Sequence, residues 1–257
     1  AAYTKPYLTP AQQVDLLKSK GMEVSDRSKA EACLSRIGYY RLSAYWYPFR
    51  RFEDAPHPSR KNQRVVKDGF QSGTRFSDCL DLYVFDKQLR LLVMDALERV
   101  EIALRTDIAL LLGSLDVVAH TNKSLLAADF TTNVKSNTGK TGHYAWLEKQ
   151  NSSFKRSKVD FVKHFTSIYP EEDMPIWMAV ELWDFGMLSH FFAGIKQTEK
   201  NKIASAYLLP HGKVLESWLR SLNVLRNSCA HHKRLWNKPT GRTPSWAKLQ
   251  HSREPRN

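Results

Sequence analysis

A long stretch of helical spacing without proline or glycine constrains the fold of this chain more than any other feature. Across residues 77–112 the apolar side chains recur every three or four positions, and Gly113 closes the segment. A helix of that length would extend for about 50 Å at 1.5 Å per residue. We therefore predict an all-α fold in which this helix is the spine of a bundle of shorter helices.

Capping signals predict further helices near the start of the chain. Thr9 followed by Pro10 is typical of a helix start, because the hydroxyl caps the helix and proline suits its first turn. Ser28 and Glu31 have the spacing of a capping box, and the helical pattern continues from there until Pro48 ends it. The tyrosines and the tryptophan of this run favour core packing over stacking on bases.

These patterns divide the chain into four segments. Residues 51–76 are rich in proline, glycine, serine and charge, which predicts a basic loop or a small hairpin. It follows an N-terminal helical region at 1–50 and precedes the main helical domain at 77–236. Within that domain, residues 121–141 are polar and are expected to be irregular, and the last helix begins after Pro210. Residues 237–257 are expected to form an extended basic tail.

The charge of the chain favours a polyanionic partner. Lysine and arginine number 39 against 26 aspartate and glutamate residues, a net charge of +13, and much of the excess lies in 50–75 and after residue 225. Cations beside phosphates gain from counterion release, so nucleic acid is the favoured partner, with a merely solvated basic surface as the alternative. The candidate RNA-binding residues are Arg60, Lys61, Arg64, Lys67, Lys233 and Arg234.

Cysteine usage and hydropathy indicate a soluble, cytoplasmic protein. The three cysteines are scattered and lack the spacing of a disulfide framework or a zinc site. No apolar stretch approaches the roughly 18 to 20 residues of a membrane span, and no cleavable signal pattern opens the chain. We expect no membrane partner.

A polar stripe on the last predicted helix is the best candidate for a reactive site. Asn223, Asn227 and His231 follow at intervals of four and therefore lie along one helix face. Arg226 lies five residues before His231, about 140° around an ideal helix, so the two do not share this stripe. The long arginine side chain, a distorted helix end or a second subunit would be needed to bring both to one phosphate.

Histidine and arginine together suit the cleavage of RNA by its own 2′-hydroxyl. An imidazole can remove the hydroxyl proton or protonate the leaving oxygen near neutral pH, and a guanidinium stabilises charge on the phosphoryl oxygens. The sequence shows no H-E-x-x-H motif and no carboxylate cluster with metal-ligand spacing, so we expect neither a metal nor another cofactor. The bare pattern is weak, because a histidine at a helix end is more often a cap or a packing residue.

The sequence around this pattern resembles that of a known family. The segment LRNSCAHHKRLW at 225–236 looks like the signature of the Abi family of bacterial abortive-infection proteins, the AbiD and AbiF-like group within the HEPN superfamily. Further blocks resemble the same family in the same order, namely IGYYRLSAYWYPF, LYVFDKQLR, ERVEIALRT and PIW. Together they span nearly the whole chain.

The resemblance implies a HEPN-type helical bundle with ribonuclease activity. It implies a homodimer with two motifs facing one cleft, a growth-arresting toxin in phage defence, and control by a small structured antitoxin RNA. The family's motif maps onto Arg226 and His231, and the polar residue after the arginine is Asn227. The possible accessory residues are His232, Glu101 and Arg105, although the last two favour an ordinary surface pair one helical turn apart.

Two other classes of function stay open on the sequence. In a non-catalytic RNA-binding protein of the same fold, the basic segments would grip phosphates, and the arginine and histidine would be contacts only. In an all-α scaffold for protein interactions, the basic charge would be incidental, and nucleic-acid binding would be lost at moderate salt.

Overall fold

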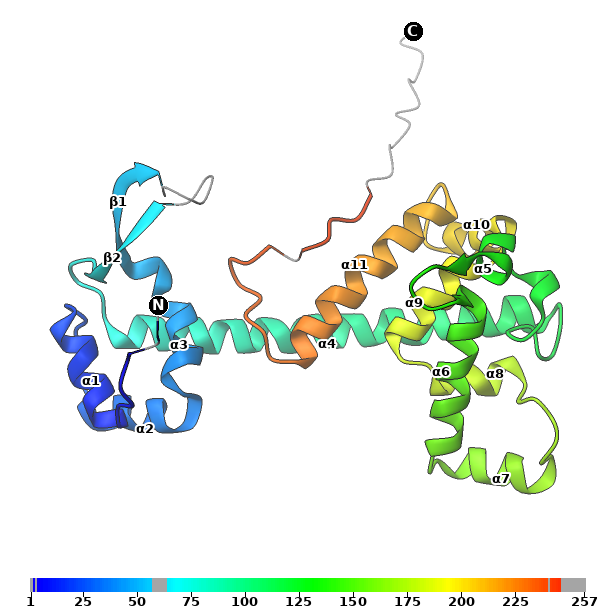
Figure 1. Cartoon of the computed structure of the whole chain (residues 1–257), viewed down its shortest axis with the longest axis horizontal. Helices are drawn as coiled ribbons and strands as arrows, with labels where there is room; N and C mark the ends of the chain where they lie inside the picture. The colour runs from blue at the N-terminus through cyan, green and yellow to red at the C-terminus, as the bar shows by residue number, and fades with distance from the viewer. Residues whose placement is uncertain (1, 3, 57–63, 240, 246–257) are drawn as a thin grey trace, which may run out of the picture. The chain divides into compact units, whose positions relative to one another are not determined.

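The structure is a computed structural model that describes residues 2, 4–56, 64–239 and 241–245. The chain forms two compact units, Ala1–Arg90 and Leu91–Asn257, and the division falls within the long helix α4 (Figure 1). The predicted helical fold is confirmed, because the described elements are mainly helices with two small two-stranded sheets. The spine predicted at 77–112 is also confirmed, as α4 extends over Phe76–Gly113.

The N-terminal unit packs three short helices and a hairpin around the start of α4. Strands β1 and β2 pair antiparallel with irregular register, so the predicted basic loop or small hairpin at 51–76 is a hairpin. Leu17, Leu42, Trp46 and Phe70 are buried in the core of this unit together with Phe76 of α4. The elements before α4 are α1 (Pro10–Ser19), α2 (Arg27–Ile37), α3 (Tyr39–Trp46), the 3-10 helix η1 (Tyr47–Phe49), β1 (Arg50–Pro56) and β2 (Arg64–Phe70).

The caps of α1 and α2 test the predicted helix starts. Thr9 caps α1 as predicted, and Gln12 completes a capping box with it. The capping box predicted at Ser28 is wrong, because the cap of α2 lies two residues earlier, at Asp26, whose carboxylate accepts a hydrogen bond of 2.9 Å from the Lys29 amide. Glu31 pairs with the side chain of the first helical residue rather than with the backbone of a cap. A carboxylate is at least as good a cap as a serine hydroxyl, and it also suits the positive end of the helix.

The C-terminal unit consists of the rest of α4 and the helices that pack with it. The irregular structure expected at 121–141 is only partly found, because this stretch includes a short helix and a two-stranded sheet. The elements are η2 (Lys123–Leu125), α5 (Ala128–Thr132), β3 (Val134–Lys135), β4 (Lys140–Thr141), α6 (Gly142–Arg156), α7 (Asp160–Ile168), α8 (Ile176–Ala179), η3 (Val180–Leu182), α9 (Phe185–Gly194), α10 (Gln197–Ala206) and α11 (Gly212–Ala230).

Aromatic side chains fill the centre of the C-terminal core. The rings of Trp146, Trp183 and Phe191 lie 4.7 to 4.8 Å apart between centroids, and all three side chains are buried. The Trp146 indole Nε1 donates to the Met187 carbonyl at 3.1 Å, so the tryptophan is buried without an unpaired donor. Helix α11 packs against α9 and α10, which fixes its position in the unit.

A buried ion pair stabilises the N-terminal unit. Asp86 and Arg90 lie one turn apart on α4 and form an ion pair, with Asp86 fully buried and Arg90 almost so. The Tyr45 hydroxyl of α3 donates to Asp86 Oδ2 at 2.6 Å. Burial, together with the hydrogen bond to Asp86, raises the pKa of Tyr45 to about 12. The hydroxyl therefore keeps its proton and remains a donor to the carboxylate over the physiological pH range.

We expect Asp86→Ala to destabilise the N-terminal unit by about 3–5 kcal/mol, because it removes the carboxylate that offsets the buried Arg90 charge. Asp95→Ala is a matched control, since Asp95 and Arg99 form a pair of the same spacing on the same helix but are exposed. Urea unfolding followed by circular dichroism measures both variants. An equal, small effect of the two substitutions would contradict the role assigned to the buried pair.

Candidate functional site

Helix α11 carries Arg226 and Asn227, His231 is its C-cap, and the helix is anchored at its N-terminal half. The His211 side chain caps the helix through a hydrogen bond of 3.2 Å from the Lys213 amide to Nδ1. Leu215 and Leu219 are buried in the core of the C-terminal unit. The last turns of the helix then present their polar residues toward the surface, as the sequence stripe predicted.

The polar stripe of α11 begins beside the first turn of α9. The Asn227 amide Nδ2 donates to Asn223 Oδ1 at the long distance of 3.5 Å. Asn223 in turn lies close to Gly186, where an added Cβ atom would be 3.6 Å from the Asn223 amide. The stripe on α11 therefore begins at Asn223, beside the start of α9, and ends at the exposed His231.

Arg226 lies at a hollow of about 390 Å³ that α4 helps to form. Its Nε atom is buried and has no hydrogen-bond partner among the described residues. Sequence reasoning missed most of the residues around it, although their helical spacing on α4 would have placed them on one face. The other residues that line the hollow are Leu91, Met94, Asp95, Leu97, Glu98 and Glu101.

Glu101 and Arg105 form more than an ordinary surface pair. Arg105 Nη2 lies 2.5 Å from Glu101 Oε1 and donates to the Trp183 carbonyl at 2.7 Å. Both side chains are largely buried, so the expectation of an exposed pair is wrong, while the one-turn spacing is as expected. The pair holds Glu101 in place at the edge of the hollow that it shares with Arg226.

Asp184 places a negative charge near Arg226. Burial by itself would raise the pKa of Asp184, but hydrogen bonds from Lys149 and the Met187 amide, with the charges of Lys149 and Arg226, lower it. The Lys149 Nζ atom lies 2.7 Å from the carboxylate. Arg226 thus lies near several acidic groups, whose negative charges attract the guanidinium.

The end of α11 sharply redirects the chain after His231. The His232 amide donates to the Cys229 carbonyl at 3.0 Å and the Lys233 amide to the Ser228 carbonyl at 2.9 Å, which is the Schellman pattern. His232 has a φ of 54°, in the left-handed region that a residue other than glycine rarely adopts. The second histidine of the motif thus occupies the position at which most helices of this kind end in glycine.

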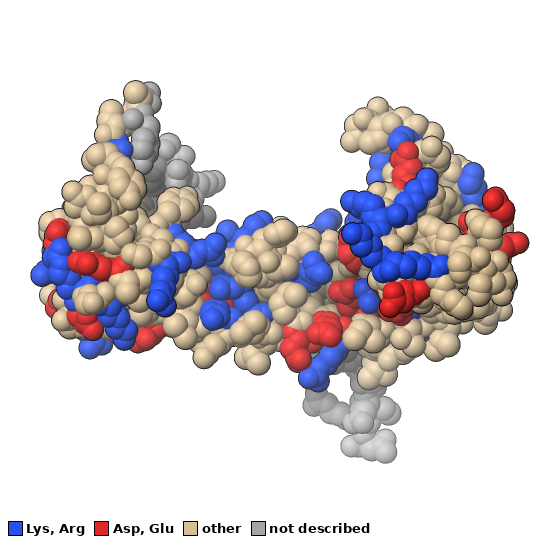
Figure 2. Space-filling view, turned by 90° about the horizontal axis from the view of Figure 1, so that it is seen from below, with Lys and Arg blue, Asp and Glu red and all other residues tan. Residues whose placement is uncertain are grey.

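Basic side chains gather directly after the motif. A hollow of about 220 Å³ is lined by Ser228, Lys233, Arg234, Leu235 and Lys238, among others. It brings together the two basic residues predicted for the C-terminal segment. Figure 2 shows the lysine and arginine side chains of the drawn face in several groups, with acidic side chains between them.

The basic hairpin of the N-terminal unit is described only in part. The Lys67 Nζ atom lies 3.5 Å from Glu53 Oε1 in an exposed pair, so this cation is locally balanced. Arg60 and Lys61 lie outside the described residues, as does the side chain of Arg64. The RNA-binding role of these four residues stays a prediction.

Within the described part of the chain, no three or more His, Cys, Asp or Glu side chains are grouped to hold a metal ion. The helices described there also include none with the length and apolar character needed to cross a membrane.

The left-handed backbone at His232 gives a direct test of its conformational role. We expect His232→Gly to unfold at the temperature of the wild type or above it, because glycine adopts this φ without strain. His232→Val should unfold at a lower temperature, by an amount that corresponds to about 1–2 kcal/mol, because a β-branched residue is strained there. Thermal unfolding of the two variants side by side measures the difference, and equal midpoints would contradict this account.

Comparison with known proteins supports the resemblance seen in the sequence. No curated protein and no solved structure matches the chain. The family model described as Abi-like protein matches residues 32–237, which include α4, α11 and the motif. This family is associated with abortive infection, a defence against phage. Because the match covers most of the chain, the protein belongs to the Abi-like family.

Proposed function

We propose that this protein is a metal-independent endoribonuclease of the HEPN type that acts as a growth-arresting toxin in phage defence. The observation that carries the proposal is the arrangement at the end of α11. There the Arg226 guanidinium borders a hollow with a buried, unpartnered Nε atom, and an exposed histidine follows five residues later. Cleavage by a 2′-hydroxyl requires a cation for the phosphate and a group that can transfer protons, and the end of α11 offers one residue of each kind.

His231 is the acid or base in this proposal, and Arg226 stabilises the phosphate. The 2′-oxygen attacks the adjacent phosphorus as its proton passes to an imidazole, and the bond to the 5′-oxygen breaks as that oxygen gains a proton. Charge on the phosphoryl oxygens is offset by the guanidinium, whose fork donates paired hydrogen bonds. The Asn227 amide lies on the same stripe as His231 and can orient the ribose or the phosphate.

The reaction needs both an acid and a base. A single His231 can act as one or the other at a time, but not as both at once. A homodimer with two α11 ends at one scissile phosphate would supply two histidines and two arginines. It would also remove the difficulty that Arg226 and His231 lie on different sides of one helix. We therefore include a homodimer in the proposal, as well as control by a small structured antitoxin RNA and a cytoplasmic location.

Carboxylates around Arg226 have a defined role in this proposal. The hollow of Arg226 is lined by Asp95, Glu98 and Glu101, and their negative charges favour a conformation in which the arginine side chain stays within the hollow. Since these charges oppose a phosphate, the substrate gains affinity elsewhere, from Lys233 and Arg234 directly after the motif. His232 is an accessory residue through its backbone, because it turns the basic segment back beside the helix end.

Arg226→Ala and His231→Ala should each abolish RNA cleavage and toxicity while the fold is kept, because neither side chain belongs to the buried core. Total RNA incubated in EDTA with each purified variant measures cleavage, and the ends are then mapped. The products should carry 2′,3′-cyclic phosphates, since the nucleophile is internal to the RNA.

Matched controls keep this test specific. Arg220→Ala removes an exposed arginine of the same helix, and His164→Ala removes an exposed histidine of α7, so both variants should cut RNA as the wild type does. Strict dependence on magnesium, or cleavage by His231→Ala at the rate of the wild type, would refute the mechanism. RNA binding without any cleavage by the wild type would instead identify the non-catalytic alternative.

The basic segments should contribute affinity without taking part in the chemical step. Replacing Arg60, Lys61, Arg64 and Lys67 by alanine should flatten the salt dependence of RNA binding, by roughly 0.7 to 0.9 in the log–log slope for each phosphate that these cations bind in the wild type. The double variant of Lys233 and Arg234 should do the same. Cleavage at saturating RNA should persist in both, whereas an unchanged slope would show that these cations only solvate the surface.

A further inference from the structure

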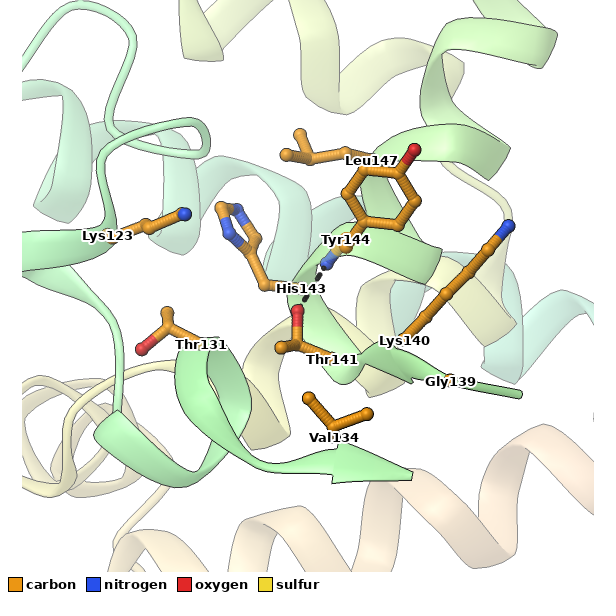
Figure 3. Close-up of a pocket in the computed structure, with 9 residues that line it drawn as sticks. All are labelled: Lys123, Thr131, Val134, Gly139, Lys140, Thr141, His143, Tyr144 and Leu147. Atoms are coloured by element: carbon orange, nitrogen blue, oxygen red, sulfur yellow. Dashed lines mark hydrogen bonds between the residues drawn. The ribbon is translucent and has the colours of Figure 1, made fainter. Parts of the chain in front are cut away.

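A second hollow of the C-terminal unit lies where α6 begins, and we propose that it binds a nucleotide through its phosphate group (Figure 3). The hollow measures about 480 Å³, within the range of small-molecule sites, and shares no lining residue with the hollow of Arg226. The residues that matter for binding come from η2, α5, β4 and α6, namely Lys123, Thr131, Lys140, Thr141, His143 and Tyr144.

His143 gives the hollow a buried acceptor that lacks a donor. The side chain is only 1% exposed, and its Nε2 atom lies 2.8 Å from the carbonyl oxygen of His120. A carbonyl only accepts, so Nε2 carries the ring proton and Nδ1 offers a lone pair. Nδ1 is buried and has no hydrogen-bond partner among the described residues, which favours a ligand that donates a hydrogen bond.

The charge state of His143 agrees with this tautomer. Burial lowers the pKa of His143 against the opposing effect of the His120 carbonyl, and the positive charge of Lys123 lowers it further. The ring is therefore neutral at neutral pH and cannot satisfy Nδ1 by taking up a proton. Burial also lowers the pKa of His120, whose carbonyl contacts His143, to about 4, so this second imidazole is neutral at neutral pH too.

The beginning of α6 and Lys123 make the mouth of the hollow favourable for an anion. Helix α6 is 15 residues long, and its first-turn amides and dipole are positive at this end. Thr141 Oγ1 accepts from the Tyr144 amide at 3.1 Å, which leaves its hydroxyl proton free to donate to a ligand. Figure 3 shows Lys123 pointing toward the His143 ring, and this lysine has no ion-pair partner in the described part of the chain.

An exposed aromatic ring borders the same hollow. Tyr144 is 54% exposed, and the Lys140 Nζ atom lies 5.4 Å from the centre of its ring. Lys140 is also paired with Glu148 at 2.6 Å, so it holds the ring rather than offering an unbalanced charge. A ring face at one side of an anion site is a platform on which a base can stack.

The hollow thus combines a site for an anion, a buried hydrogen-bond acceptor and an aromatic ring. A nucleotide can use all three, whereas a bare anion uses only the first. Phosphate oxygens would contact Lys123, Thr141 and the first-turn amides, a ribose hydroxyl or a base amino group would donate to His143 Nδ1, and the base would lie against Tyr144. The nucleotide can be free or can be the 5′-phosphorylated end of an RNA strand. This inference is independent of the chemistry proposed for α11.

Calorimetric titration with 5′-AMP, adenosine and inorganic phosphate tests the proposal. The nucleotide should bind at least about tenfold more tightly than either part, and Lys123→Ala should weaken it by on the order of tenfold by losing a charge-assisted contact. Tyr144→Ala should weaken it as well. Lys29→Ala is the matched control, since it removes an exposed lysine of α2 and should leave the affinity unchanged.

A second arm distinguishes the two sources of the nucleotide. A short RNA with a 5′-phosphate is titrated against His231→Ala protein, so that cleavage does not interfere, and is compared with the same RNA without the phosphate. Tighter binding of the phosphorylated RNA than of 5′-AMP, abolished in Lys123→Ala, identifies a strand end, and the reverse order identifies a free nucleotide.

Nuclear magnetic resonance of histidine labelled with nitrogen-15 reports on His143 directly, because Nδ1 should shift when it gains a donor. No binding of either nucleotide source would overturn the proposal. So would an affinity unaffected by Lys123→Ala, equal affinities for 5′-AMP and inorganic phosphate, or an unmoved His143 Nδ1 signal in the nucleotide-bound protein.

Discussion

Burial of α4 is the interaction on which the rest of the structure depends. Its first turns contribute Phe76 and Cys79 to the core of the N-terminal unit, and its later turns contribute Leu104, Ile108 and Leu112 to the core of the C-terminal unit. Each unit therefore relies on the same helix for part of its apolar core. Short helices such as α8, of four residues, are unstable alone and owe their form to such packing.

The candidate site follows from the same helix, because α4 forms most of the wall of the hollow in which Arg226 lies. On the side of α4 that does not face the core, Asp95, Glu98 and Glu101 line this hollow, and α11 contributes Arg226 to it. A catalytic arginine must both approach the charge that it stabilises and keep a fixed orientation, and buried surroundings restrict its rotamers. In this respect the acidic hollow is compatible with the proposed chemistry, although its charge does not attract a phosphate.

Periodicity in the sequence was sufficient for the long elements and insufficient for the short ones. The spine helix, the α1 cap and the polar stripe of α11 follow from local spacing, and each is found as predicted. The Asp26 cap, the helix α5 within a polar stretch and the partly buried Glu101–Arg105 pair depend on neighbours distant in sequence. Asp95 and Glu98 beside Arg226 were likewise missed, since nothing in the local pattern says that α4 and α11 meet there.

The left-handed turn at His232 has a consequence for how sequences of this family are compared. A histidine next to the proposed catalytic residue invites a chemical interpretation, yet its backbone admits mainly glycine, asparagine or another residue tolerant of positive φ. Relatives that exchange this histidine for glycine would therefore preserve the helix end and should not be counted as having lost the motif. Relatives with valine or isoleucine there would have to end the helix in another way, even where the arginine and the first histidine are retained.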